Sequence, residues 1–332
     1  MFLSRFFCLA VCLTSFSACT AKSVAATDSD VVDTLIASDS AGDTNVVDSA
    51  SDVSATATWR DSLKICWTDL SCKRAFVISH GGDWSLADFP YDSEGAFHRA
   101  FDKGADGIKT DVHVTKDNVA VVAHSSPILG YESPDCGGQK IEEMTADEVT
   151  KCHILSVPQG DSTFQRLDTV LEWARGKVII MLTVKESKDF PRAIQTVIEH
   201  NALDYVFLET SLGDLQNAIP LSPDWKKSWY NAEVDSPNDV TLLTETLKLP
   251  QVAFCEVNVK YQEAENETLP KLLAEKIHPA GMRGFVSSIH LPEVAQHEAL
   301  WNAGFDVIMT YTLDNAMEAR RNINTARGIS PP

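Results

Sequence analysis

The chain has 332 residues and a formal net charge of −19 at pH 7, and 44% of its residues are hydrophobic. This length allows one large α/β barrel or two smaller domains, and the hydrophobic content is sufficient for a substantial core. The negative charge argues against a nucleic-acid surface, because phosphate backbones are bound by clustered Lys and Arg. An anionic substrate would therefore have to bind in a local positive pocket of an acidic protein.

The N-terminal region has the features of an export signal. Arg5 precedes an apolar run from Phe6 to Phe16, which is too short to span a bilayer and is followed by small residues. The sequence Phe-Ser-Ala-Cys that ends at Cys19 is similar to a bacterial lipobox. We therefore predict a signal peptide over residues 1–19 and acylation of Cys19, with ordinary signal cleavage nearby as the alternative.

The segment that follows has a composition typical of disorder. Residues 20–58 contain seven Asp, one Lys and no aromatic residue, so burial cannot offset the entropy of ordering them. We expect an acidic tether here and a globular domain over residues 59–332. With an acylated Cys19, the protein would be exported to a bacterial envelope and would contact the membrane only through its lipid anchor.

Cysteine spacing in the globular part suggests disulfides. Cys66 and Cys72 flank a five-residue gap, and Cys136 and Cys152 bracket a loop. In an exported protein these spacings predict the pairs Cys66–Cys72 and Cys136–Cys152, with Cys255 left as a free thiol in an apolar strand.

Apolar runs and helix signals alternate along the globular part. The predicted strands are Ala75–Ser79, Gly107–Val114, Lys177–Lys185, Tyr205–Leu208, Ser228–Glu233, Val252–Val257, Gly284–Ser288 and Val307–Thr310. The predicted helices are Glu94–Lys103, Thr145–Cys152, Leu167–Arg175, Phe190–Asn201, Leu212–Ile219, Val240–Leu247, Leu269–Ile277, Pro292–Ala303 and Asp314–Asn322. Eight strands that alternate with helices predict an α/β fold of the (β/α)8 TIM-barrel type.

A hairpin follows the second predicted strand. Only four residues separate Gly107–Val114 from the short apolar run Val119–Ala123. A parallel crossover needs a dozen or more residues, so the two runs must be antiparallel. The hairpin therefore returns His124 toward Lys109 and Asp111.

Polar residues at the carboxyl ends of barrel strands are the candidates for function. His80 and the returned His124 follow neighbouring strands, and two histidines can divide the work of phosphodiester cleavage. One removes a proton from the nucleophile while the other protonates the leaving oxygen. Lys185 ends the third strand and can hold a phosphate as a point charge.

The motifs around these residues resemble those of the glycerophosphodiester phosphodiesterase family, which shares its barrel with spider-venom phospholipase D. The resemblance runs from about Phe76 to Tyr311 and implies a barrel of the phospholipase C-like phosphodiesterase type. The matching segments are His80-Gly81-Gly82 for His-Arg-Gly, Gly104 to Asp111 for Gly-Ala-Asp-Gly-Ile-Glu-x-Asp, Val121 to Ser125 for Val-Val-x-His-Asp, and Thr183 to Lys185 for Glu-x-Lys.

The departures from these motifs concern the metal. The family is expected to bind one divalent cation, Mg²⁺ or Ca²⁺, through the Glu-x-Asp pair and the later Glu. In this chain Lys109 and Thr183 stand at the two Glu positions and Asp111 alone remains, which is a weak site for a hard cation. Glu209 and Glu256, at later strand ends, are the candidate replacement ligands.

Two functions are compatible with this pattern. The first is a phosphoric diester hydrolase that acts on glycerophosphodiesters or related lipid head groups. His80 and His124 would exchange proton roles, and Lys109, Lys185 and Asp111 would bind the substrate, with the Lys109 ammonium in place of the metal. The second is a non-catalytic lipoprotein that binds a phosphate ester or lipid head group on a decayed barrel. The retention of both histidines favours the enzyme.

Overall fold

The computed structural model describes residues 66, 69–85, 89–154, 162–234, 237–243, 252–257, 271–287 and 291–329. The predicted signal peptide, Cys19 and the predicted tether lie outside the described residues. Along β8 the backbone alone is described, so the free thiol predicted at Cys255 and the side chain of Glu256 are outside it too.

The described residues form ten strands. They are β1 (Phe76–His80), β2 (Gly107–Val114), β3 (Ala120–Val122), β4 (Gln165–Arg166), β5 (Ile179–Val184), β6 (Val206–Ser211), β7 (Trp229–Val234), β8 (Val252–Val257), β9 (Arg283–Ser287) and β10 (Val307–Thr310).

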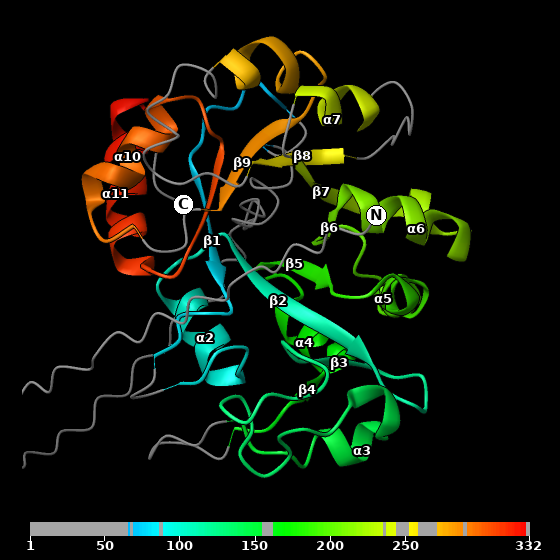
Figure 1. Cartoon of the computed structure of the whole chain (residues 1–332). Coiled ribbons are helices and arrows are strands. Elements are labelled where there is room, and N and C mark those ends of the chain that lie inside the picture. Colours follow the sequence, from blue (N-terminus) through cyan, green and yellow to red (C-terminus); the bar gives the residue numbers. More distant parts are fainter. Residues whose placement is uncertain are drawn as a thin grey trace, which may run out of the picture. The chain divides into compact units, whose positions relative to one another are not determined.

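Eight of these strands are parallel and close into a ring (Figure 1). The ring runs β1-β2-β5-β6-β7-β8-β9-β10, and β10 pairs with β1 to complete it. This confirms the predicted (β/α)8 barrel, and each predicted strand is present close to its expected bounds. The two-residue strand β4, which pairs antiparallel with β3, was missed because so short a segment has no periodicity to detect.

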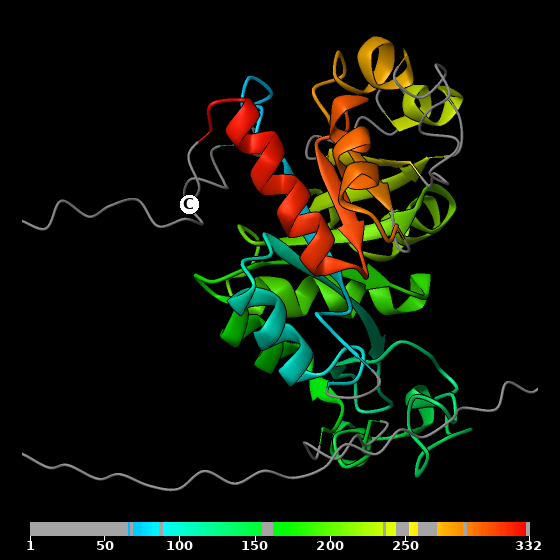
Figure 2. The same ribbon diagram turned by 90° about the vertical axis from the view of Figure 1, so that its left-hand side faces the viewer.

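Helices lie outside the ring of strands (Figures 1 and 2). They are α2 (Glu94–Asp102), α3 (Ala146–Val149), α4 (Leu167–Ala174), α5 (Phe190–Glu199), α6 (Leu212–Ala218), α7 (Pro237–Thr241), α10 (Val294–Asn302) and α11 (Leu313–Ala326). Short 3₁₀ or π segments are η1 (Ile141–Glu143), η2 (Ser187–Asp189), η3 (Ile219–Leu221), η4 (Trp225–Lys227) and the π-helical η6 (Leu273–Ile277). Among the described residues, no helix combines the length and apolar character needed to cross a bilayer.

Helix ends differ from the predictions in a few places. The capping box at Thr145 is present, but α3 ends at Val149 rather than at Cys152. α7 begins at Pro237, three residues before the predicted start, and residues 244–250 lie outside the description.

Successive side chains of a strand point to opposite faces, so each barrel strand contributes to two apolar layers, one inside the ring and one outside it. Inside the ring, Phe76, Ile179 and Phe285 belong to a core that also includes Cys66. Outside it, residues of the opposite parity, such as Val77 and Ile108, pack in a second core with the helices. Towards the carboxyl ends of the strands the inward-facing side chains become polar, as at His80 and Asp111, and the candidate site therefore lies at this end of the barrel.

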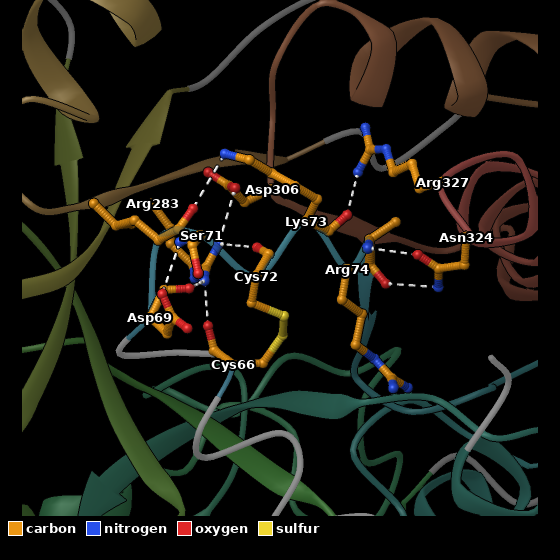
Figure 3. Close-up of a disulfide and its surroundings, with 12 residues drawn as sticks. Cys66, Asp69, Ser71, Cys72, Lys73, Arg74, Arg283, Asp306, Asn324 and Arg327 are labelled. Carbon is orange, nitrogen blue, oxygen red and sulfur yellow. Dashed lines mark hydrogen bonds and ion pairs between the residues drawn. A yellow bond between two sulfur atoms is a disulfide. The ribbon is translucent and has the colours of Figure 1, made fainter. Parts of the chain in front are cut away.

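The amino-terminal end of the barrel is anchored by Arg283, the first residue of β9 (Figure 3). Its buried guanidinium donates to the carbonyl oxygens of Cys66, Asp69 and Cys72, and it pairs with Asp306 at 3.0 Å. These carbonyls belong to the loop closed by the Cys66–Cys72 disulfide. A charge-assisted contact therefore fixes the chain just before it enters β1.

The loop beyond the hairpin is closed by the second predicted disulfide, Cys136–Cys152. Both cysteines pack in a separate apolar cluster with Val121, Ile128 and Phe164. This cluster holds the loop that contains α3 beside β3.

We predict that the Cys136–Cys152 bond stabilises the fold by restricting the unfolded chain. Its cysteines are 16 residues apart, and a disulfide that closes a loop of this size stabilises the folded state by about 3 kcal/mol. Replacement of both cysteines by Ala should lower the free energy of unfolding by about that amount, measured by urea denaturation. The matched pair of replacements at Cys66 and Cys72, which close a loop of only six residues, should cost less, about 2 kcal/mol. An unchanged unfolding midpoint in the Cys136/Cys152 variant would contradict the prediction.

Candidate active site

Neighbouring strand ends place the candidate residues. His80 is the last residue of β1 and is in register with Lys109 on β2. Asp111 lies two residues further along the same face of β2, and Lys185 follows β5, the other neighbour of β2. The hairpin brings its returning arm to the same place, because the backbone N–H of Ala123 donates to the carbonyl oxygen of Asp111 at 3.1 Å.

The buried carboxylate of Asp111 is the centre of the site. Its Oδ1 lies 2.7 Å from Nζ of Lys109 and 2.8 Å from Nζ of Lys185. Lys109 is buried as deeply as Asp111, whereas about a third of the Lys185 side chain is exposed. One carboxylate thus orients two ammonium groups, one inside the barrel and one at its mouth.

These charges stabilise one another against burial. Burial alone would raise the pKa of Asp111, but Lys109 and Lys185 outweigh it and hold that pKa below its usual range. Burial alone would lower the pKa of Lys109, but Asp111, Glu209 and Asp92 outweigh it and raise the pKa. Both groups are therefore charged at neutral pH.

Asp92 is a second buried carboxyl group beside the first. Its Oδ2 accepts from the backbone N–H of Asp111 at 3.5 Å. Burial, followed by the negative charge of Asp111, raises the pKa of Asp92 well above its ordinary value. The pKa values of these two neighbouring carboxyl groups are therefore shifted in opposite directions, down for Asp111 and up for Asp92.

Tyr91 connects the two sides of the site. Its hydroxyl lies 3.1 Å from Nδ1 of His80, 3.2 Å from Oδ2 of Asp111 and 3.4 Å from Nζ of Lys109. Its ring lies against Gly81, where the backbone has φ +72° and a Cβ would overlap the ring. The space beside the first histidine, where the family motif has Arg, is therefore filled by Tyr91.

The two histidines have different surroundings. Burial, and then the positive charge of Lys109, lowers the pKa of His80 to about 2. His124 is more exposed, and its Nδ1 lies 2.8 Å from the carboxylate of Glu132. The Tyr91 ring contacts both histidines, with its centroid 5.6 Å from each imidazole centroid.

A cavity of about 310 Å³ opens beside these groups. Its wall combines aromatic and apolar side chains with His124 and the two carboxyl residues Asp92 and Glu132, the other lining residues being Trp84, Ser85, Pro90, Tyr91, Tyr131, Ile154, Phe164 and Tyr311. Tyr131 and Glu132 lie between His124 and the Cys136–Cys152 disulfide, so the segment that leads into the disulfide-closed loop lines the cavity.

The residues at the family's metal position do not fit a divalent cation. The described part of the chain contains no cluster of three or more His, Cys, Asp or Glu side chains that could hold a metal ion. Asp111 is already engaged by two ammonium groups, and the candidate ligand Glu209 accepts a hydrogen bond from Thr183. Since hard cations need several oxygen ligands, Lys109 and Thr183 remove what such an ion would require.

The structure thus brings His80, Lys109, Asp111 and Lys185 into one set of contacts, with His124 joined to it through the Tyr91 ring. Asp92, Glu132 and Tyr91 were not identified from the sequence. Asp92 and Tyr91 lie in the loop after β1, a place where barrel enzymes carry functional residues. Glu132 had no such signal, because only the folded loop brings it to His124.

Comparison with known proteins gives a consistent result. The profile of the "Glycerophosphoryl diester phosphodiesterase family" matches residues 86–325. A curated glycerophosphodiester phosphodiesterase from Caldanaerobacter subterraneus subsp. tengcongensis is 35% identical over 78 residues, which are 24% of this chain and 30% of that protein. The match therefore spans less than a third of that relative.

Solved structures share the fold over most of the chain. A glycerophosphodiester phosphodiesterase from Agrobacterium tumefaciens is 18% identical with a TM-score of 0.60, covering 74% of this chain and 99% of that one. One from Parabacteroides distasonis is 19% identical with a TM-score of 0.63, covering 80% and 92%. A phosphodiesterase from Oleispira antarctica, in complex with its product sn-glycerol-3-phosphate, is 15% identical with a TM-score of 0.57, covering 74% and 96%.

We predict that Asp111→Asn destabilises the protein in a pH-dependent way. At pH 7 it leaves two ammonium groups without their carboxylate, and loss of one partner of a buried pair costs about 3–5 kcal/mol. The folded pKa of Asp111 lies below its ordinary 3.8, so the folded chain binds fewer protons than the unfolded chain as the pH falls. Wild-type stability is therefore lost as the pH falls through and below about 4, and the variant lacks this contribution.

The difference in free energy of unfolding between wild type and Asp111→Asn should thus narrow from pH 6 to pH 3, measured by urea denaturation at each pH. Asp102→Asn, at an exposed position on α2, serves as the control and should follow the wild type. A difference that stays constant over this range would show that Asp111 is not held ionised by the two lysines.

Proposed function

This chain belongs to the glycerophosphoryl diester phosphodiesterase family, as its motifs predicted, and on that premise we propose that it hydrolyses glycerophosphodiesters or related lipid head groups. The observation that carries the proposal is the pair of histidines that both contact the ring of Tyr91, next to two ammonium groups oriented by Asp111. Sites of this composition provide both the proton transfers and the positive charge that cleavage of a phosphodiester needs.

In the proposed reaction one histidine takes a proton from water as the oxygen forms a bond to phosphorus. The other gives a proton to the leaving alcohol as the P–O bond breaks. The products are an alcohol and a phosphate monoester, and the relative from Oleispira antarctica with bound sn-glycerol-3-phosphate is an example of such a product. Glu132 orients His124 through its contact with Nδ1 at 2.8 Å.

The two lysines take different parts in this proposal. Lys185, at the mouth of the barrel and partly exposed, contacts a phosphate oxygen of the substrate. Lys109 is buried, so it acts as a fixed positive charge behind the phosphate rather than as a direct ligand. The Lys109 ammonium thus supplies one positive charge at the place where the family's divalent cation would supply two.

The cavity receives the organic part of the substrate. Trp84, Tyr91 and Tyr311 contact one another edge to face at centroid distances of 5.5–6.3 Å, forming a rigid aromatic wall. Such a wall favours the apolar part of a head group or lipid. Export and lipidation at Cys19 remain predictions from the sequence, and they would place the enzyme next to lipid-derived substrates.

We predict phosphodiesterase activity that does not depend on a metal. The purified protein, assayed on glycerophosphodiesters, should keep its activity in EDTA because Lys109 supplies the charge. His124→Ala should lower kcat by roughly 10²–10⁴-fold, the usual contribution of a general acid or base. His200→Ala, a partly exposed histidine paired with Glu172 on the helical layer, is the matched control and should remain active.

Each alternative outcome has a distinct meaning in this assay. Loss of activity in EDTA would show that a metal is bound after all. Binding of a phosphate ester without turnover under any condition would favour the non-catalytic binding protein.

We predict that Lys109→Glu creates a divalent-cation site. The new carboxylate would join Asp111 and stand close to Glu209, whose negative charge already acts on Lys109, so several oxygens would be available. Calorimetry with Mg²⁺ or Ca²⁺ should show binding by the variant that the wild type lacks. Lys177→Glu, an exposed replacement before β5 at the other end of the barrel, controls for the added negative charge. Equal binding by the two variants would rule out a specific site.

A further inference from the structure

The Tyr91 hydroxyl has three polar partners, and they use its whole hydrogen-bonding capacity. Nδ1 of His80, Oδ2 of Asp111 and Nζ of Lys109 lie 3.1, 3.2 and 3.4 Å from its oxygen. A tyrosine hydroxyl has one proton to donate and two lone pairs that accept. Each of the three contacts must therefore have a defined direction.

The direction of each bond follows from the chemistry of the partner. The ammonium of Lys109 can only donate, and the ionised carboxylate of Asp111 can only accept. The hydroxyl proton is therefore directed to Asp111, and one lone pair accepts from Lys109. The remaining lone pair faces His80, so Nδ1 of His80 has to carry a proton.

We propose that Tyr91 is a positioning residue: with Asp111 it fixes His80 in the Nδ1–H tautomer and leaves Nε2 as the atom that accepts a proton in the reaction. The tautomer follows from the resting site alone, whereas the use of Nε2 rests on the proposed function. The chain of contacts is Nδ1–H of His80 to Tyr91, and the Tyr91 hydroxyl to Asp111. It works like the carboxylate–histidine pair of a catalytic triad, with a hydroxyl group between the two.

The surroundings of Tyr91 and His80 support this arrangement. Burial, together with Asp92 and Asp111, raises the pKa of Tyr91 well above its ordinary value, so the group stays a hydroxyl. The pKa of His80, lowered to about 2, keeps its ring neutral, and within the described residues Nε2 has no hydrogen-bond partner. A bound phosphate adds negative charge near the ring, which strengthens Nε2 as a base.

The proton balance of the step assigns separate parts to the two histidines. Nε2 of His80 takes a proton from the attacking water as the O–P bond forms, and the resulting imidazolium is stabilised by Asp111 through Tyr91. His124, which faces Glu132, gives its proton to the leaving oxygen as the P–O bond breaks. His80 then loses a proton to solvent and His124 regains one, so the site returns to its resting state.

Gly81, which follows His80, is required for the same arrangement. Any side chain at Gly81 would overlap the Tyr91 ring, and the backbone there has φ +72°, which favours glycine. The change from the family's Arg to Gly81 therefore makes room for Tyr91. A site that had merely lost its Arg would not contain a hydroxyl bonded to three charged or titratable groups.

The first test is a nitrogen-15 NMR spectrum of histidine-labelled wild-type protein at pH 7, with the His80 signals assigned through a His80→Asn variant. Protonated and bare imidazole nitrogens have widely separated shifts, so the tautomer is read directly. The expected spectrum shows Nδ1 protonated and Nε2 bare. The reverse assignment, or a doubly protonated ring, would overturn the proposal without any variant of Tyr91.

The second test is Tyr91→Phe, which keeps the ring against Gly81 and removes only the hydroxyl. We expect His80 to populate both tautomers and kcat to fall by roughly tenfold or more, up to the roughly 10²–10⁴-fold that a general base contributes, with KM nearly unchanged. Tyr205→Phe, which removes the hydroxyl of a buried tyrosine bonded to the carbonyl oxygen of Leu171, is the matched control and should alter neither quantity. A Tyr91→Phe protein with wild-type tautomer and wild-type kcat would refute the positioning role.

These readouts separate the inference from the proposed function. If the protein shows no turnover, the tautomer of His80 is still measured, so the positioning inference stands or falls independently. If turnover occurs but the tautomer of His80 is reversed, the proposed phosphodiesterase function is supported and the positioning role of Tyr91 is refuted.

Discussion

The interaction on which the site depends is the contact of one buried carboxylate with two ammonium groups and a hydroxyl. Asp111 faces Lys109, Lys185 and Tyr91 at 2.7–3.2 Å. A buried charge is costly unless it is paired and hydrogen-bonded, so these partners must be present together. The carboxylate keeps Lys109 charged in the barrel, directs Lys185 to the mouth, and takes the proton of Tyr91. The position of His80 then follows from that hydroxyl.

Much of the fold could be predicted because barrel strands leave a strong local pattern. Each inward-facing residue is followed two positions later by another, so apolar runs that end in a polar residue revealed both the strands and the candidate site. His80, Asp111 and Lys185 were identified in this way. The returning hairpin was also predictable, since four residues cannot make a parallel crossover.

The remaining parts of the site depend on contacts between segments distant in sequence. Glu132 reaches His124 because the chain turns back between these two residues, and no periodicity records that turn. Asp92 is a loop residue whose importance lies in its burial beside Asp111. The hydroxyl of Tyr91 has three polar partners from different segments, and no local pattern predicts these contacts. Spacing indicates which residues share a strand face, but not which loop side chain enters the space between two strands.

The departures from the family motifs are better explained together than singly. Lys109 in place of Glu brings its own positive charge to Asp111, and Thr183 in place of Glu donates to Glu209, which would otherwise be a buried carboxylate without that partner. Gly81 in place of Arg admits the ring of Tyr91. Random loss of a metal site would leave buried charges unpaired, at a cost of several kcal/mol for each. Here Lys109 and Thr183 each supply a partner to a neighbouring carboxylate and Gly81 makes room for Tyr91, which favours a site reorganised around an ammonium over one that has decayed.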